Sequence, residues 1–276
     1  MAEVALVADS NVASSPPLMG ATKKLGAAEL LYLRAEQMGL KPCWITPHGL
    51  FVITTESGEH YIHDARSALN SHVGISLARN KHLTRLILER HNLPNIPFAR
   101  PKTLEEATAF LHAQQKIIVK PVRGLGAHDI RIVEHTDQLA GLQVSKYIFE
   151  RYIAGREFRY LVLNDTTIGV HESEYGVSVE ADRMLRRISY PAVEWDPILM
   201  ELSARVARVL GLKFAAVDYL VDEHGKAHIL EVNTTPGLKW FHAPTSGPSV
   251  DVAYHLLNAL LTETTIEQPT EDGVIV

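Results

Sequence analysis

Cysteine is nearly absent from this chain, since Cys43 is the only one in 276 residues. A single cysteine cannot form an intramolecular disulfide, which fits a reducing compartment, and we expect the protein to be cytoplasmic. Cys43 lies in the apolar run 42–45, which predicts a buried structural thiol rather than a nucleophile. The sequence also lacks any Cys/His or Ser/His pattern, so catalysis through a covalent protein intermediate is not expected.

Long apolar runs and an excess of positive charge are missing as well. No run approaches the roughly 18 apolar residues of a membrane-spanning helix, and the N-terminus carries Glu3 instead of the basic residues of a signal peptide, so no membrane partner is expected. The formal net charge of -5 argues against a nucleic-acid partner, because binding a phosphate backbone requires a basic face. Hydrophobic residues make up 46% of the chain, which is enough for two or three compact lobes.

The order of periodic segments predicts an α/β (α+β) chain. Strands are expected at residues 3–8, 44–46, 50–55, 116–120, 130–133, 147–152, 158–163, 167–170, 214–221 and 227–232, and helices at 24–38, 74–91, 104–114, 197–210 and 250–261. We expect a small N-terminal β/α lobe over residues 1–72, a central lobe with a glycine loop over 73–146, a third lobe over 147–265 and a loose tail over 266–276.

An acidic pattern marks the expected hairpin near the end of the chain. Asp218 interrupts an apolar strand, and Glu231 and Asn233 lie two residues apart at the end of the next strand. A turn over residues 222–225 would pair Asp218 with Ile229 and place Asp218, Glu231 and Asn233 on one face, because side chains alternate along strands. Three hard oxygen ligands in one patch suit Mg²⁺. A hydrogen-bonded strand acid and a solvated glutamate remain the alternative for Asp218 and Glu231.

Two lysines and a glycine loop suggest a phosphate site. Lys120 ends an apolar strand, where a lysine is costly to bury without an anion. Gly124 and Gly126 follow it, and glycines let backbone N–H groups approach a phosphate closely. Lys81, in the expected helix 74–91, would point into the same cleft. A plain turn explains the two glycines equally well, and Lys81 would then be an ordinary solvated lysine.

The segment after the central lobe offers groups for a nucleotide. Glu150, on an extended strand, could accept a hydrogen bond from an adenine amino group, and Glu157 could hold two ribose hydroxyls. Arg159 and Arg187 provide planar forks for phosphate or carboxylate. Taken alone, each arginine could equally form a surface salt bridge.

Taken in order, these segments resemble the ATP-grasp superfamily over about residues 70–260. The motifs that carry the resemblance are Asn80-Lys81…Thr84, residues 118–121 and 124–126, Glu150-x-x-Ile153-x-Gly155-x-Glu157-x-Arg159, Asp218, and Glu231-x-Asn233-x-x-Pro236-Gly237. Within the superfamily the chain is most similar to the glutathione synthetase-type domain of bifunctional glutathione synthetases and to cyanophycin synthetase, and it is also similar to ribosomal-protein glutamate ligases of the RimK type.

The resemblance implies an ATP-grasp fold, in which two α+β lobes behind the small N-terminal lobe clasp ATP and Mg²⁺, with Mn²⁺ as an alternative ion. It implies a carboxylate–amine ligase that forms an acyl phosphate on an amino acid or short peptide and releases ADP and phosphate. The implied roles are phosphate binding by Lys81, Lys120, Gly124 and Gly126, adenine binding by Glu150 and Ile153, ribose binding by Glu157, metal binding by Asp218, Glu231 and Asn233, and contact with the reacting groups by Arg159, Arg187 and Asn233.

The chain departs from the family pattern in its short glycine loop and in lacking the insertion common to the glutathione synthetase-type domain. These departures leave the identity of the acid and amine substrates open. Three other functions stay open too: an ATP-grasp enzyme of another class, such as a kinase or an ester-forming peptide modifier, a non-catalytic nucleotide-binding subunit, and a plain interaction domain. Whether the chain forms a homo-oligomer is open as well.

Overall fold

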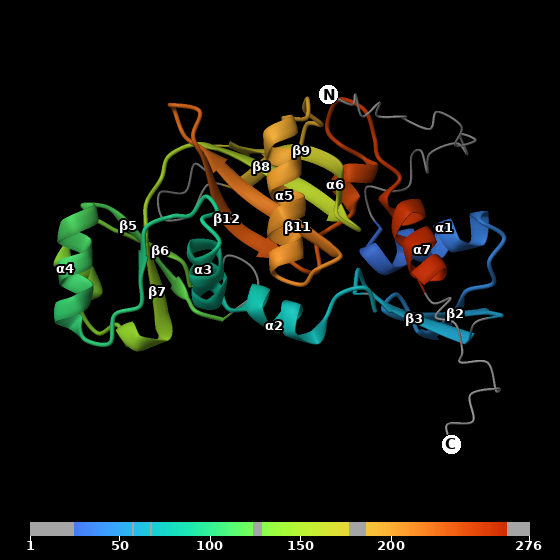
Figure 1. Cartoon of the computed structure of the whole chain (residues 1–276), viewed down its shortest axis with the longest axis horizontal. Coiled ribbons are helices and arrows are strands. Elements are labelled where there is room, and N and C mark those ends of the chain that lie inside the picture. Colours follow the sequence, from blue (N-terminus) through green and yellow to red (C-terminus); the bar gives the residue numbers. More distant parts are fainter. Residues whose placement is uncertain (1–24, 57, 67, 124–128, 177–185, 264–276) are drawn as a thin grey trace, which may run out of the picture.

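The structure, a computed structural model, describes residues 25–56, 58–66, 68–123, 129–176 and 186–263. The expected strand over residues 3–8 and the loop residues Gly124 and Gly126 lie outside these ranges. The described chain forms three sheets along the long axis of the molecule (Figure 1), with the three-stranded sheet at one end, the five-stranded sheet in the middle and the four-stranded sheet at the other end.

The three-stranded sheet packs against two helices from opposite ends of the chain. It contains β1 (Cys43–Thr46), β2 (Leu50–Thr55) and β3 (Gly58–His63), with antiparallel pairing in the order β1-β2-β3. Helix α1 (Ala27–Gln37) covers it and packs on α7 (Val252–Glu263). The last helix therefore completes the core of the N-terminal lobe.

Cys43 is exposed, so the prediction of a buried thiol is wrong. The residue begins the edge strand β1, and strand alternation turns the next residue, Trp44, inward instead. The Trp44 ring stacks on Tyr32 with ring centroids 4.4 Å apart and meets the edge of Phe51 at 5.4 Å. The apolar run 42–45 at this sheet edge therefore covers only every second residue, and only in part.

The expected helix over residues 74–91 is two helices, α2 (His72–Arg79) and α3 (Lys81–Arg90). Asn80 breaks the helix with an extended backbone, and its side-chain oxygen accepts a hydrogen bond from the N–H of Leu83, which caps α3. The backbone of Asn80 bridges to Arg123, and the N–H of Lys81 donates to the carbonyl of Val122. The backbone of Lys81 is therefore held beside the end of β5, the strand that carries Lys120.

The four-stranded sheet has its own core and one covering helix. Its strands follow the order β4-β7-β5-β6, and all neighbours are antiparallel. The elements are β4 (Phe98–Ala99), α4 (Leu104–Gln114), β5 (Ile117–Pro121), β6 (Arg131–Val133), two short 3-10 turns (Thr136–Leu139 and Val144–Lys146) and β7 (Tyr147–Arg151). Helix α4 has the predicted bounds, since the Thr103 hydroxyl caps it by accepting from the N–H of Glu106.

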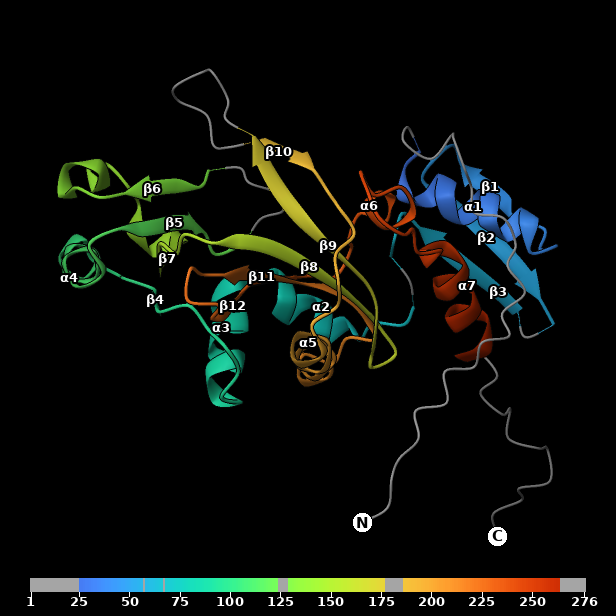
Figure 2. The same ribbon diagram turned by 90° about the horizontal axis from the view of Figure 1, so that it is seen from above.

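The five-stranded sheet is antiparallel throughout, in the order β10-β9-β8-β11-β12. Its elements are β8 (Arg156–Leu163), β9 (Thr166–Gly176), β10 (Arg186–Ser189), β11 (Phe214–Val221) and β12 (Ala227–Asn233), with helices α5 (Pro197–Val209) and α6 (Lys239–His242). In Figure 2, α5 lies on one side of β8, β9 and β11, against which it packs.

The two faces of this sheet have different partners. Tyr160, Val162 and Val217 face α5 and belong to one buried cluster. On the opposite face, Leu161 and Ala216 pack into the core of the N-terminal lobe. The N-terminal lobe covers one end of this face. The polar residues Arg159 on β8 and Asp218 on β11 lie on the same face, beside the covered end.

The expected division into lobes stays a prediction. The structure pairs β7, which begins at the expected boundary, with β4 and β5 of the four-stranded sheet. In the part of the chain that the structure describes, no helix combines the length and hydropathy needed to cross a membrane.

Candidate functional site

The hairpin formed by β11 and β12 does not have the predicted register. Val221 pairs with Ala227, so the turn contains one residue more than expected, and a β-bulge at Leu230 adds another. Asp218 therefore pairs with Glu231 instead of Ile229. The turn and the bulge each shift the pairing by one residue, and together they shift it by two. Because side chains alternate with a period of two, Asp218, Glu231 and Asn233 still lie on one face, as predicted.

The bulge decides which side chains meet. If the pairing near the turn continued without it, Asp218 would lie opposite Leu230, and Glu231 would point to the other side of the sheet. With the bulge, Asp218 and Glu231 are direct neighbours across two strands, and Asn233 pairs with Ala216 on the same face. The bulge therefore brings the three expected metal ligands onto one face.

Four side chains form a row across the sheet. The cross-strand partners are Glu231 on β12, Asp218 on β11, Arg159 on β8 and His171 on β9. Arg159 donates from Nε to Asp218 Oδ1 and from Nη2 to Oδ2, both at 2.6 Å, which is a bidentate pair. Burial lowers the pKa of the Arg159 guanidinium, but the Asp218 carboxylate outweighs burial and raises it, so this arginine stays charged.

Glu231 is crowded by a second carboxylate. Burial and the negative charge of Asp218 raise the pKa of Glu231, and the positive charges of Lys120 and Arg159 offset part of this effect. A hydrogen bond between the two carboxyl groups contributes to the same shift. A buried and a half-buried carboxyl group that favour a shared proton also favour a cation that replaces it.

Lys120 is buried as the sequence indicated, and a protein carboxylate supplies its anion. Its Nζ lies 2.7 Å from Glu150 Oε2, and Arg85 Nε donates to Glu150 Oε1 at 2.9 Å. Glu150 is 1% exposed. Burial raises the pKa of Glu150, but Arg85 and Lys120 more than offset it and lower the pKa to about 2. Glu150 is therefore the ionised centre of a buried triad.

Lys81 belongs to the same group of charges. Burial and the positive charge of Lys120 lower the pKa of Lys81, while the charges of Glu231 and Glu150 raise it. Both lysines, from α3 and β5, therefore lie within electrostatic reach of Glu231 on β12. The hydrogen bonds of Arg85 agree with this, because it binds Glu150, the partner of Lys120, and also the carbonyl of Leu230, which precedes Glu231.

Comparison with known proteins identifies the family. Residues 78–237, more than half of the chain, match the ATP-grasp domain family. The chain is an ATP-grasp protein. This confirms the resemblance inferred from the sequence motifs and the expected fold class.

The relatives and solved structures are distant. The chain is 26% identical over 187 residues to a probable alpha-L-glutamate ligase of Rhodopirellula baltica, with 64% of this chain and 46% of the relative covered. It spans between 46% and 64% of the length of the first curated relatives that it matches. A bifunctional glutathione synthetase from Pasteurella multocida superposes with a TM-score of 0.65 at 13% identity, over 88% of this chain and 44% of that one.

A second similar structure was solved with a nucleotide bound. It is the ATP-grasp ligase PsnB in complex with a phosphomimetic variant of a minimal precursor, Mg and ADP. The TM-score is 0.59 at 22% identity, over 71% of this chain and 61% of that chain. At these identities the two structural matches show that the ATP-grasp fold is shared.

The remaining expected residues lie around the same strands of the ATP-grasp fold. Glu157 is buried on β8, two residues before Arg159 and on the same face of the sheet. Ile153 is half-buried in the link between β7 and β8. The backbone of Arg187 lies in β10, beside β9. The roles expected for these residues stay predictions.

Sequence reasoning missed Arg85 and His171. Arg85 lies one helical turn after Lys81 on α3, at a spacing that puts both on one side of the helix, and this was the available signal. His171 is 1% exposed, and its ring contacts Phe241 and Tyr190 with centroids 4.7 and 5.5 Å away. Its place opposite Arg159 depends on a strand pairing that the sequence did not reveal.

Proposed function

We propose that this ATP-grasp protein is an ATP-dependent carboxylate–amine ligase. It would activate the carboxylate of an amino acid or short peptide as an acyl phosphate, pass the acyl group to an amine, and release ADP and phosphate. The observation that carries the proposal is the buried Lys120–Glu150 pair, which Arg85 joins to the carbonyl of Leu230, next to Glu231 of the acidic row. The similarity to a probable alpha-L-glutamate ligase supports the choice of reaction.

The two lysines would reduce the repulsion between the anions that react. A carboxylate that attacks the γ-phosphate brings two anions together, and fixed positive charges offset their repulsion and orient the phosphates. Lys120 is held in one position by Glu150, and the backbone of Lys81 is fixed by its hydrogen bond to the carbonyl of Val122. The ammonium group of Lys120 is therefore in place before a nucleotide binds.

Residues of the β11–β12 hairpin fit a bound Mg²⁺. Asp218, Glu231 and Asn233 offer hard oxygen atoms on one face, and burial and the neighbouring Asp218 raise the pKa of Glu231, an effect that a bound cation would oppose. A carboxylate can accept about four hydrogen bonds or ligand bonds, so Asp218 can keep its pair with Arg159. Among the residues that the structure describes, no three His, Cys, Asp or Glu side chains form a metal-binding group. The proposed site has two carboxylates and one amide, and phosphate oxygens would complete its shell.

When bound, Mg²⁺ would supply positive charge at the phosphate oxygens. The chain's own residues would do the rest of the work. Arg159, fixed and charged by Asp218, would hold an anionic oxygen near the acidic row. Exclusion of water would protect the acyl phosphate from hydrolysis until the amine attacks.

Phosphate release from ATP, screened across amino acids and short peptides, tests the proposal. We expect release that requires both Mg²⁺ and an acceptable carboxylate, and hydroxylamine should trap the activated acyl group as a hydroxamate. Lys120→Ala should remove the activity, whereas Lys116→Ala is a matched control, because Lys116 is exposed and pairs with Glu134 at the surface. Carboxylate-independent phosphate release, or phosphorylation of a hydroxyl group, would reject the ligase assignment in favour of a kinase or a simple ATPase.

A further inference from the structure

Arg85 makes more side-chain hydrogen bonds than the salt bridge to Glu150 alone. The side chain is 2% exposed. Its Nη1 donates to the carbonyl of Ile229 at 2.5 Å and to Asn95 Oδ1 at 3.0 Å, and its Nη2 donates to the carbonyl of Leu230 at 2.8 Å. Together with the bond from Nε to Glu150, these contacts use every nitrogen of the guanidinium.

The acceptors of Arg85 come from separate parts of the fold. Glu150 is on β7 of the four-stranded sheet, and the two carbonyls belong to β12 of the five-stranded sheet. Asn95 lies in the segment between α3 and β4. One buried side chain on α3 therefore ties the strand that orients Lys120 to the strand that carries Glu231. A guanidinium suits this arrangement because its donors form a rigid planar fork.

Arg85 contacts β12 at the bulge. Leu230 is the extra residue, without a partner in the ladder between β11 and β12, so its carbonyl depends on another donor. Arg85 supplies that donor and also binds the carbonyl of Ile229 next to it. Because the bulge turns Glu231 toward Asp218, the donor that satisfies the bulge also holds Glu231 on the face of the site.

We propose that Arg85 is a positioning residue of the nucleotide cleft, which fixes Lys120, through Glu150, relative to Glu231 at the bulge of β12. The inference rests on the proposed function, because it concerns the same cleft. Arg85 acts through its neighbours and has no contact with the reacting groups in this account. It sets the distance between the cations of one sheet and the acidic row of the other.

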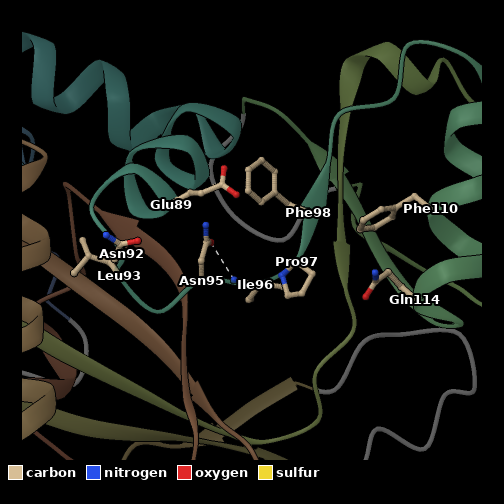
Figure 3. Close-up of a pocket in the computed structure, with 9 residues that line it drawn as sticks. All are labelled: Glu89, Asn92, Leu93, Asn95, Ile96, Pro97, Phe98, Phe110 and Gln114. Atoms are coloured by element: carbon tan, nitrogen blue, oxygen red, sulfur yellow. Dashed lines mark hydrogen bonds between the residues drawn. The ribbon is translucent and has the colours of Figure 1, made fainter.

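Asn95 fixes Arg85 in turn. Its Nδ2 donates to the backbone carbonyl of Arg85 at 2.9 Å, while its Oδ1 accepts from Arg85 Nη1 and from the N–H of Ile96. Figure 3 shows Asn95 in the wall of a pocket between α3, the following linker and α4, with Asn92 nearby in the same wall. Asn92 is exposed, which makes it a matched control for Asn95.

The experiment compares Arg85→Met, Arg85→Lys and Asn95→Ala with the controls Arg90→Met and Asn92→Gly. Arg90 is exposed on the same helix, and glycine tolerates the positive φ of Asn92. Affinity for a non-hydrolysable ATP analogue is measured by calorimetry with Mg²⁺, at a temperature where each variant is fully folded. Hydrogen exchange of residues 229–233 is measured by mass spectrometry without nucleotide. Analogue affinity reports on the nucleotide cleft, and hydrogen exchange reports on the bulge of β12. A loss of global stability alone would not change both measurements in protein that is fully folded.

Arg85→Met should weaken analogue binding by about tenfold or more, the scale of a lost charge-assisted hydrogen-bond network, and should speed exchange at residues 229–233. Arg85→Lys should recover much of the affinity, because it keeps a charge beside Glu150, but not the protection of the bulge, because one ammonium cannot reach both carbonyls. Asn95→Ala should show a smaller loss of both, and the two controls should match the wild type.

Two results would overturn the inference in distinguishable ways. Wild-type binding combined with unaltered affinity and exchange in Arg85→Met would show that Arg85 does not position the cleft, while the proposed function would stand. Failure of the wild type to bind the analogue at all would remove the proposed function and this inference with it.

Discussion

Replacing Glu150 by glutamine tests the buried triad. Glu150 is 1% exposed, and Arg85 and Lys120 contact its two oxygens at 2.9 and 2.7 Å. Its pKa falls from 4.5 to about 2, which corresponds to about 3 kcal/mol of unfolding free energy, since one pKa unit is worth about 1.4 kcal/mol. Glutamine keeps the shape but not the charge, so Glu150→Gln should lose about this amount at neutral pH.

The sign of the pH dependence follows from the lowered pKa. The stabilisation is fully present above the unfolded-state value of 4.5 and is lost as the pH falls toward about 2. Urea unfolding of the wild type and of Glu150→Gln, from about pH 7 down to about pH 3 at constant ionic strength, should therefore show two curves that converge below about pH 4.5. Glu134→Gln is the control, because its pair with Lys116 is exposed and solvated. A difference between wild type and Glu150→Gln that stays constant down to about pH 3 would refute an ionised, paired Glu150.

Four further substitutions test three residues of the site and one close backbone contact. Asp218→Asn and Glu231→Gln should each abolish phosphate release with the fold intact by circular dichroism, and unchanged turnover in either would remove that residue from the metal site. Lys120→Ala should weaken binding of a non-hydrolysable ATP analogue by about 1.5–3 kcal/mol in calorimetry, and wild-type affinity would place Lys120 outside the cleft. Gly155→Ala should lower the unfolding free energy by about 1–3 kcal/mol, because an added Cβ would lie 2.5 Å from the carbonyl oxygen of Val221, and an unchanged urea midpoint would contradict that clash.

Local signals predicted the elements whose ends are fixed by nearby residues. Helix α4 begins where Thr103 caps it, and the turn at Asn164 and Asp165 is formed by two residues with positive φ, a conformation that Asn and Asp tolerate better than most side chains. The break at Asn80 was not predicted, because apolar spacing continues through it. The reason for the break is a backbone bridge to Arg123, which is distant in sequence.

The sequence predicted which residues lie together better than it predicted how they pair. Strand alternation placed Asp218 and Glu231 on one face, although the bulge that makes them direct partners has no signature in the sequence. The anion that accompanies Lys120 was expected to be a phosphate, and the structure supplies Glu150. Arg85 was missed because Glu150 and the carbonyls of Ile229 and Leu230 lie 65 to 145 residues away and become its neighbours only in the folded chain.

The central claim is that a carboxylate is activated as an acyl phosphate. Oxygen-18 placed in the carboxylate of a substrate found in the phosphate-release screen tests it most directly. The label should appear in the released phosphate, because that oxygen bridges carbon and phosphorus in the intermediate and leaves with phosphorus when the amine attacks. Phosphate release that depends on the same verified carboxylate, but without transfer of the label, would contradict the acyl-phosphate mechanism and the ligase assignment.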